Sequence, residues 1–219
     1  MIIAIDGPAA SGKSTTAKLV AKKLKMTYLD TGAMYRAVTL ALLRSNTDLD
    51  DYDSVCQVVD ELELDIYDQG SKTVIRLDGE DVSKEIRSMQ VTENVSAVSA
   101  VKYVREAMVE IQRNIGKKTN CVVEGRDIGT VVFPDAEFKI FMVADDKMRA
   151  ERRLKELHLM GENRSLQEVM TNLKKRDQKD STRSHSPLLK ADEAIEIDTS
   201  MLSIDQQVEK IINLVREKK

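Results

Sequence analysis

The chain has 219 residues, with 34 Lys and Arg against 37 Asp and Glu and an aromatic content of 4% without Trp. This balance argues against a protein that binds nucleic acid mainly through bulk charge, and few aromatic rings are present to stack on single strands. Two cysteines are too few for a disulfide framework, and no apolar run approaches the ~20 residues that span a bilayer, so we expect a cytoplasmic protein with one sizeable core and no membrane or nucleic-acid partner.

The chain opens with a short apolar run at 2–6, which predicts a buried strand. The run is followed by a stretch that fits G-x-x-x-x-G-K-[ST], made up of Gly7, Pro8, Ala9, Ala10, Ser11, Gly12, Lys13 and Ser14. Apolar residues at helical spacing then predict a helix over 15–24. A strand, a glycine loop and a helix in this order predict a phosphate-binding loop, in which Lys13 reaches the β- and γ-phosphates and Ser14 ligates Mg²⁺.

Four more apolar runs, at 27–30, 121–124, 138–143 and 194–198, predict buried strands separated by helices. With the first strand they predict an α/β fold, a five-stranded parallel sheet with helices on both faces. Ligands of such sheets bind beyond the carboxyl ends of the strands, so polar residues there are the first candidates for a site. A capping box beginning at Ser203 and an apolar stripe predict a last helix that packs on the sheet.

The region 46–118 is too long for a simple crossover between strands. Alternating apolar residues from Leu62 to Ile66, an apolar run at 73–77 and a short run at 80–82 predict three strands, with a turn at 68–71 and a hairpin at Asp78-Gly79. Two amphipathic helices follow, carrying Val91, Val95 and Val98, and then Val104, Met108 and Ile111. A small antiparallel sheet is therefore inserted into the core, either as a substrate-selecting subdomain or as a structural elaboration.

Polar residues follow two of the predicted strands. Thr31 is a good N-cap, and Arg36, little more than one turn later, could clamp an anion at the same helix start. The plainer interpretation is an ordinary cap and a solvated arginine. Arg126 and Asp127 follow the strand at 121–124, where we expect both to face a cleft, whereas the sequence leaves the orientation of Glu124 open.

Two basic clusters flank a loop at 160–164. The preceding helix carries three arginines on one face, namely Arg149, Arg152 and Arg153. The following helix, with a capping box from Ser165 to Glu168, carries a second set at i, i+4 and i+7, namely Arg176, Asp180 and Arg183. The pattern predicts a lid that closes over transferred phosphate, although solvated helix faces with a surface ion pair would give the same spacing.

Six stretches, taken together, resemble the bacterial cytidylate kinases, a family of nucleoside-monophosphate kinases. They run in the family's order from residue 5 to about 184 and read IDGPAASGKST, LDTGAMYR, LDGEDVSKEIR, VSAVSAVKYVRE, EGRDIGTVVFPDA and KKRDQKDSTRS. The resemblance implies a single P-loop kinase unit, and we expect a monomer, which the surface composition permits. It divides the chain into a core at 1–45, 119–148 and 186–219, a nucleoside-monophosphate-binding insert at about 46–118, and a lid at about 149–185.

The resemblance also implies transfer of the γ-phosphoryl group of ATP to CMP or dCMP, with Mg²⁺. By this likeness the loop from Gly7 to Thr15 binds ATP. The implied CMP-binding set comprises Thr31, Tyr35, Arg36, Ser96, Arg105, Arg126, Asp127, Arg176, Asp180 and Arg183, of which Ser96, Arg105 and Asp127 would face the cytosine. The implied catalytic set comprises Lys13, Arg126, Asp127, Arg176 and Arg183.

Two other classes of function stay open at this point. One is a different P-loop kinase, acting on UMP, AMP or shikimate. The other is a nucleotide-switched binding module, although the sequence contains no N-K-x-D-type guanine reader.

Overall fold

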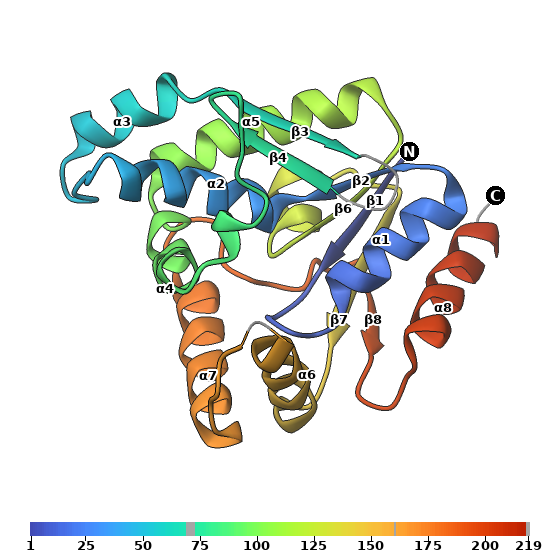
Figure 1. The fold of residues 1–219 in the computed structure, drawn as a ribbon. Helices are drawn as coiled ribbons and strands as arrows, with labels where there is room; N and C mark the ends of the chain where they lie inside the picture. The colour runs from blue at the N-terminus through green and yellow to red at the C-terminus, as the bar shows by residue number, and fades with distance from the viewer. Residues whose placement is uncertain (69–72, 160, 218–219) are drawn as a thin grey trace. The chain divides into compact units, whose positions relative to one another are not determined.

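The structure is a computed structural model that describes residues 1–68, 73–159 and 161–217 (Figure 1). The chain forms two compact units: the first combines Met1–Leu29 with Thr119–Lys219, and the second is Asp30–Lys118. The second unit thus begins at the end of the second strand. The functional boundaries expected from the sequence, an insert from about 46 and a lid from about 149, stay predictions.

The first unit is built on a parallel sheet with the strand order β2-β6-β1-β7-β8. Its strands are β1 (Ile2–Asp6), β2 (Thr27–Asp30), β6 (Cys121–Gly125), β7 (Phe138–Val143) and β8 (Ile195–Asp198). This confirms the predicted α/β fold class. The central strand β1 pairs with β6 on one side and β7 on the other, so the loop after β1 leaves the sheet where the strand order changes direction.

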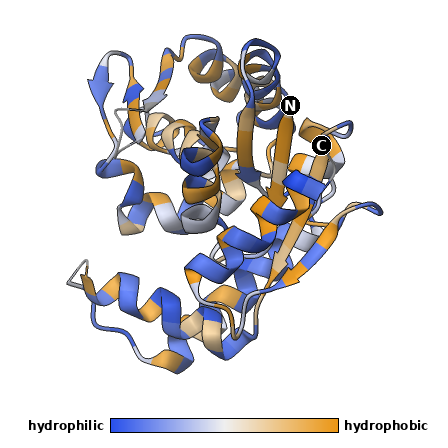
Figure 2. Cartoon of the chain, turned by 90° about the vertical axis from the view of Figure 1, so that its right-hand side faces the viewer, coloured by the Kyte–Doolittle hydropathy of each residue, from blue (hydrophilic) through white to orange (hydrophobic). Residues whose placement is uncertain are grey.

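One face of this sheet forms an apolar core with two helices, α1 (Lys13–Leu24) and α8 (Ile204–Glu217). Alternate residues of the central strands point to that face, and Figure 2 shows the strands of the parallel sheet as largely hydrophobic. The expected capping box of α8 is present, since the Gln206 amide donates to the Ser203 hydroxyl and the Gln206 side chain accepts from the Ser203 amide. The expectation that β8 is buried was wrong: only Ile197 is buried, because β8 forms an edge of the sheet.

Two further helices of this unit, α6 (Asp146–Leu159) and α7 (Leu166–Thr182), pack against each other through a smaller apolar cluster. The capping box predicted at Ser165 and Glu168 is confirmed at the start of α7. The loop expected between the helices includes Met160, which lies outside the described residues. None of the helices in the described part of the chain is long and apolar enough to cross a bilayer.

The second unit contains the predicted antiparallel sheet, with the strand order β3-β4-β5. Its elements are α2 (Thr31–Arg44), α3 (Tyr52–Asp60), β3 (Leu64–Asp68), β4 (Thr73–Leu77), β5 (Glu80–Asp81), α4 (Met89–Val98) and α5 (Lys102–Lys118). Asp78 and Gly79 take φ values of 51° and 81°, as the predicted two-residue hairpin requires. Most of the turn expected at 68–71 lies outside the described residues.

An ion-pair clamp holds this small sheet against the end of α2. The Arg44 guanidinium reaches Glu80 at 2.7 Å and Glu85 at 2.6 Å. In the same unit, apolar residues of α2 pack against β4 and the short helical turn Glu85–Arg87. Helix α2, strand β4 and the short helical turn therefore pack together as one body.

Candidate active site

The predicted phosphate-binding loop at 7–14, the phosphate loop, connects β1 to α1. Its backbone conformation requires glycine at two positions. A Cβ on Gly7 would lie 2.2 Å from the carbonyl oxygen of Met142, and Gly12 has a φ of 93°. Gly12, in a left-handed conformation, is the N-cap of α1 and contributes no side-chain hydrogen bond, and the positive end of the helix dipole at this point favours an anion. The helix begins at Lys13, two residues earlier than predicted.

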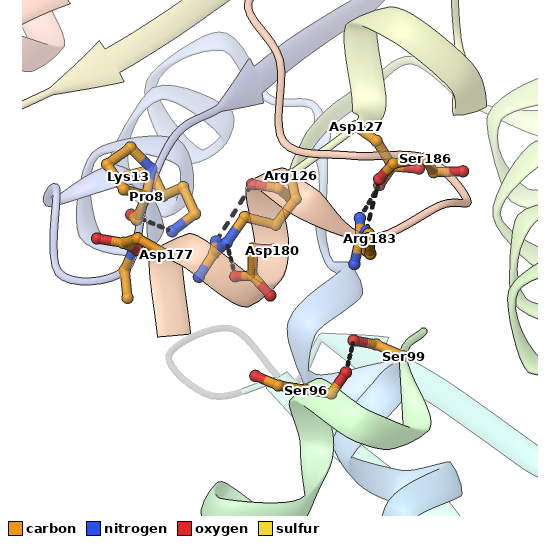
Figure 3. Close-up of polar contacts among 12 residues, drawn as sticks. Pro8, Lys13, Ser96, Ser99, Arg126, Asp127, Asp177, Asp180, Arg183 and Ser186 are labelled. Carbon is orange, nitrogen blue, oxygen red and sulfur yellow. Dashed lines mark hydrogen bonds and ion pairs between the residues drawn. The ribbon is translucent and has the colours of Figure 1, made fainter. Parts of the chain in front are cut away.

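The two motif residues with chemical roles are oriented by their neighbours. Lys13 is buried, and its Nζ donates to the Pro8 carbonyl at 3.1 Å across the loop (Figure 3). The exposed Ser14 donates its hydroxyl proton to Glu124 at 2.7 Å. Glu124, at the end of β6, also accepts a hydrogen bond from the Tyr28 hydroxyl. The side chain that the sequence could not orient therefore faces the phosphate loop.

Asp6 is a buried carboxylate that sequence reasoning assigned only to a strand. Its two oxygens accept from the amides of Ile128 at 2.8 Å and Gly129 at 2.7 Å. Burial raises the pKa of Asp6 to about 6, against the lowering effect of those amides, while Asp127 raises the pKa and Lys13 lowers it. Asp6 thus fastens the end of β1 to the turn that presents Arg126 and Asp127. The sequence signal that could have indicated this role is the position of Asp6 directly before Gly7 of the motif.

Four predicted acceptor-side residues form two contacts in the first unit. The Arg126 Nε donates to Asp180 at 2.9 Å, and the Arg183 Nη2 lies 3.8 Å from an oxygen of Asp127, as Figure 3 shows. Burial by itself would raise the pKa of Asp180, but Arg126, Arg176 and Arg183 hold it below its usual range. Arg183 was expected on the same helix face as Asp180. Instead it follows the end of α7 in an extended conformation, and its Nε donates to the Ser186 carbonyl at 2.6 Å.

The three arginines predicted to form one lid face diverge. Arg149 is buried and donates to the Ala9 carbonyl at 3.2 Å. Arg152 donates to the Ser11 carbonyl at 3.3 Å and to the Thr199 carbonyl at 2.6 Å. Arg153 pairs with Glu156 on its own helix. Two of the three therefore hold the backbone of the phosphate loop, and the role of the set as a lid stays a prediction.

In the second unit, the N-cap of α2 is Asp30 and not Thr31. An oxygen of Asp30 accepts from the Ala33 amide at 2.9 Å, and Thr31 is the first helical residue. A Cβ on Gly32 would lie 3.6 Å from an Arg36 guanidinium nitrogen and 3.2 Å from the Asp30 carboxylate. Arg87, which sequence reasoning did not single out, reaches Asp30 at 3.9 Å. The guanidinium groups of Arg36 and Arg87 thus both lie near the start of α2, and that of Arg87 pairs with Asp30.

The same unit brings together two residues expected to bind a nucleotide. The Arg105 guanidinium lies over the Tyr35 ring, 5.3 Å from its centroid, and donates to the Ser99 carbonyl at 2.9 Å. Both side chains are buried, so the guanidinium is held in one orientation. Ser96 is half-buried on α4, and its carbonyl accepts from the Ser99 hydroxyl (Figure 3).

Comparison with known proteins gives one consistent result. The family model described as cytidylate kinase matches residues 3–217. A cytidylate kinase of Fusobacterium nucleatum is 49% identical over 218 residues, covering 100% of this chain and 96% of that protein. One of Clostridioides difficile is 46% identical, and the match covers 98% of each chain.

Among solved structures, TT1252 from Thermus thermophilus has a TM-score of 0.52 at 15% identity, covering 100% of this chain and 97% of that chain. Shikimate kinase from Bacteroides thetaiotaomicron has a TM-score of 0.50 at 11% identity, covering 99% and 98%. These two share the fold.

Proposed function

The chain belongs to the cytidylate kinase family, and on that basis we propose that it transfers the γ-phosphoryl group of ATP to CMP or dCMP, giving CDP or dCDP and ADP. The observation that carries the proposal is family membership over nearly the whole chain. A glycine loop that matches the phosphate-binding motif and lies between strand β1 and the start of helix α1 supports it independently. The residues assigned below are proposals about how this chain performs the reaction.

On the donor side, residues 7–15 bind the phosphates of ATP. Phosphoryl transfer depends on positioning and on stabilising charge, more than on covalent help from the protein. The buried Lys13 supplies a positive charge to the transferred group, and its hydrogen bond to Pro8 keeps it at the loop before a donor arrives. Preorganised charge of this kind is effective because it needs no rearrangement during the reaction.

On the acceptor side, Thr31, Arg36 and Arg126 hold the monophosphate, and Tyr35 lines the pocket. Arg105 donates to O2 and N3 of cytosine, while Asp127 or Ser96 accepts from the exocyclic amine. Uracil carries N3–H, which opposes a guanidinium donor and leaves buried polar groups unpaired. Each such mismatch costs roughly 1–3 kcal/mol, which is enough to favour cytosine over uracil.

Arg176 and Asp180 approach the acceptor phosphate and ribose, and Arg183 faces the nucleotide. The contacts of Arg126 with Asp180 and of Arg183 with Asp127 support these roles. Because a carboxylate already holds each of these guanidinium groups, the arginine side chains lose less conformational freedom when substrate binds. Closure of the α6–α7 pair over the phosphates would exclude water and so limit hydrolysis of ATP.

Mg²⁺ fits the oxygen donors at the start of α1. Mg²⁺ is bound in phosphate-transfer enzymes through one or two protein oxygens together with phosphate oxygens. The hydroxyl of Ser14 and the carboxylate of Glu124 are 2.7 Å apart and supply such oxygens. When bound, the ion would neutralise charge that develops on the β- and γ-phosphates. Ser14 and Glu124 are the residues that would hold it.

Incubating the purified protein with ATP, Mg²⁺ and one acceptor at a time tests the proposal. We expect CDP and dCDP to form from CMP and dCMP, with slower or no product from UMP, AMP and shikimate. Omitting Mg²⁺ should abolish turnover. Preferred phosphorylation of another acceptor would identify a different kinase of this fold. Nucleoside-triphosphate hydrolysis without any acceptor dependence would instead favour the nucleotide-switched binding module.

A further inference from the structure

The peptide groups of Ala9, in the middle of the phosphate loop, are held by the two helices α6 and α7. The Ala9 amide donates to Asp177 of α7 at 3.3 Å, and its carbonyl accepts from Arg149 of α6 at 3.2 Å. The Ala9 methyl group lies in the apolar cluster with Ala150, Val169 and Leu173. One residue of the loop is thus fixed through its donor, its acceptor and its side chain.

Asp177 and Arg149 also contact each other, which closes a ring of three residues. The Arg149 side chain is 6% exposed and that of Asp177 18%. Burial by itself would lower the pKa of Arg149, but Asp146 and Asp177 raise it, so the guanidinium stays charged. Asp146, whose side chain is more exposed than that of Asp177, pairs with the same guanidinium at 2.6 Å. Of these two carboxylates, the Asp177 side chain accepts from the loop.

Asp177 sits on α7 directly after Arg176 and one turn before Asp180. Asp180 in turn holds Arg126 at 2.9 Å. A single helix therefore bears the acceptor-side residues and the side chain that grips the donor loop. Because an α-helix moves as a stiff unit, a shift at Ala9 is transmitted to Arg176 and Asp180.

We propose that Asp177, together with Arg149, is a positioning residue that couples the donor loop to the acceptor-side face of α7. Binding of ATP at the loop shifts the Ala9 peptide, Asp177 follows the peptide, and α7 then presents Arg176 and Asp180 in their working positions. The inference rests on the proposed function, since it takes ATP as the donor and CMP as the acceptor. It adds a role for two residues through their contacts with the phosphate loop and with each other.

The test measures thermodynamic coupling between the two nucleotides. The dissociation constant of CMP is determined by calorimetry with and without a non-hydrolysable ATP analogue and Mg²⁺. Coupling between sites commonly amounts to 5–150-fold, so we expect at least about a fivefold tightening of CMP in the unaltered protein. Asp177→Asn keeps an acceptor for the Ala9 amide but lacks the charge that holds Arg149. We expect it to reduce the tightening to less than about twofold.

Asp146→Asn is the matched control, because it removes a carboxylate from the same guanidinium without touching Ala9. It should keep the tightening of the unaltered protein. A purely structural role for Asp177 would lower the melting temperature without changing the ratio of the two CMP dissociation constants. Should Asp177→Asn fail to fold, Arg149→Lys decides, since it keeps a charge but its shorter side chain lacks the Nη1 group that contacts both Ala9 and Asp177, and it should show the same loss of coupling.

Unchanged coupling in the variants that fold would overturn the inference, and so would an unaltered protein whose CMP affinity ignores the ATP analogue. These results differ from failure of the proposed function. In that case the unaltered protein would bind no CMP or form no CDP, whatever the variants do.

Discussion

Replacing Asp6 with asparagine should remove a pH-dependent penalty from the folded state. Burial raises the pKa of Asp6 from 3.8 to about 6. At 1.36 kcal/mol for each pKa unit, a difference of roughly two units corresponds to about 3 kcal/mol. The folded state binds the proton more tightly than the unfolded state. The stability that this group contributes is therefore fully present below pH 3.8 and is lost as the pH rises through 6.

Urea unfolding of the unaltered protein and of Asp6→Asn, from pH 4 to pH 7.5, measures this penalty directly. The unfolding free energy of the unaltered protein minus that of the variant should fall by about 2–3 kcal/mol over this range. Asp51→Asn is a suitable control, because the hydrogen bonds of Asp51 to Ser54 lower its pKa and reverse the sign. If the Asp6 difference stays constant within about 0.5 kcal/mol, or rises with pH, the carboxylate is not penalised by burial and the reasoning fails.

Three further substitutions test the site. Lys13→Ala should lower kcat at least ~100-fold, as loss of one transition-state charge contact does, and near-normal turnover would contradict the role of Lys13. Arg105→Ala should reduce kcat/KM for CMP by at least about tenfold while ATP affinity holds, and an equal loss of both would reject base recognition by Arg105. Gly7→Ala should cost about 3 kcal/mol of stability in a denaturant titration, because its Cβ would meet the Met142 carbonyl oxygen at 2.2 Å. Gly129→Ala, whose Cβ would first meet the flexible Lys139 side chain at 3.3 Å, should cost clearly less, and equal costs would argue against the backbone clash.

Local patterns in the sequence were sufficient to predict most elements of the fold. Strand β1 and strand β4 have the expected bounds, because short apolar runs between turn residues leave few alternatives. The hairpin at Asp78-Gly79 followed from the positive φ values that this pair tolerates. Family membership, likewise, could be inferred from the six motifs and is confirmed over residues 3–217.

Choices between adjacent residues were harder to predict. Asp30 and Thr31 are both favourable N-caps, and the strand that precedes them can end at either position. The structure ends β2 at Asp30 and lets its carboxylate cap α2. Similarly, Arg183 continues the helical spacing of Arg176 and Asp180, yet the helix stops at Thr182. The spacing of residues along a helix predicts which of them share a face, but it does not predict the residue at which the helix begins or ends.

The contacts that orient the phosphate loop were out of reach for a different reason: they join residues far apart in the sequence. Ser14 meets Glu124 across 110 positions, and Ala9 meets Asp177 across 168. Each carboxylate looks like an ordinary polar residue in its own segment. Its role arises only when the sheet order places β6 beside β1 and packs α7 against the loop.

These carboxylates give the phosphate loop an unusual electrostatic setting. The loop that we propose to bind the phosphates of ATP has Glu124 on the Ser14 hydroxyl and Asp177 on the Ala9 amide. Both carboxylates satisfy donors that water would otherwise have to solvate, and so they help to hold the loop in its shape. An arriving triphosphate is repelled by the same negative charges, and that repulsion must be offset by the loop amides, Lys13 and the metal ion. Glu124 would hold Mg²⁺ together with Ser14, and the charge of the ion would offset that of Glu124, whereas the charge of Asp177 is already balanced by Arg149. The two carboxylates can therefore shape the loop without preventing it from binding ATP.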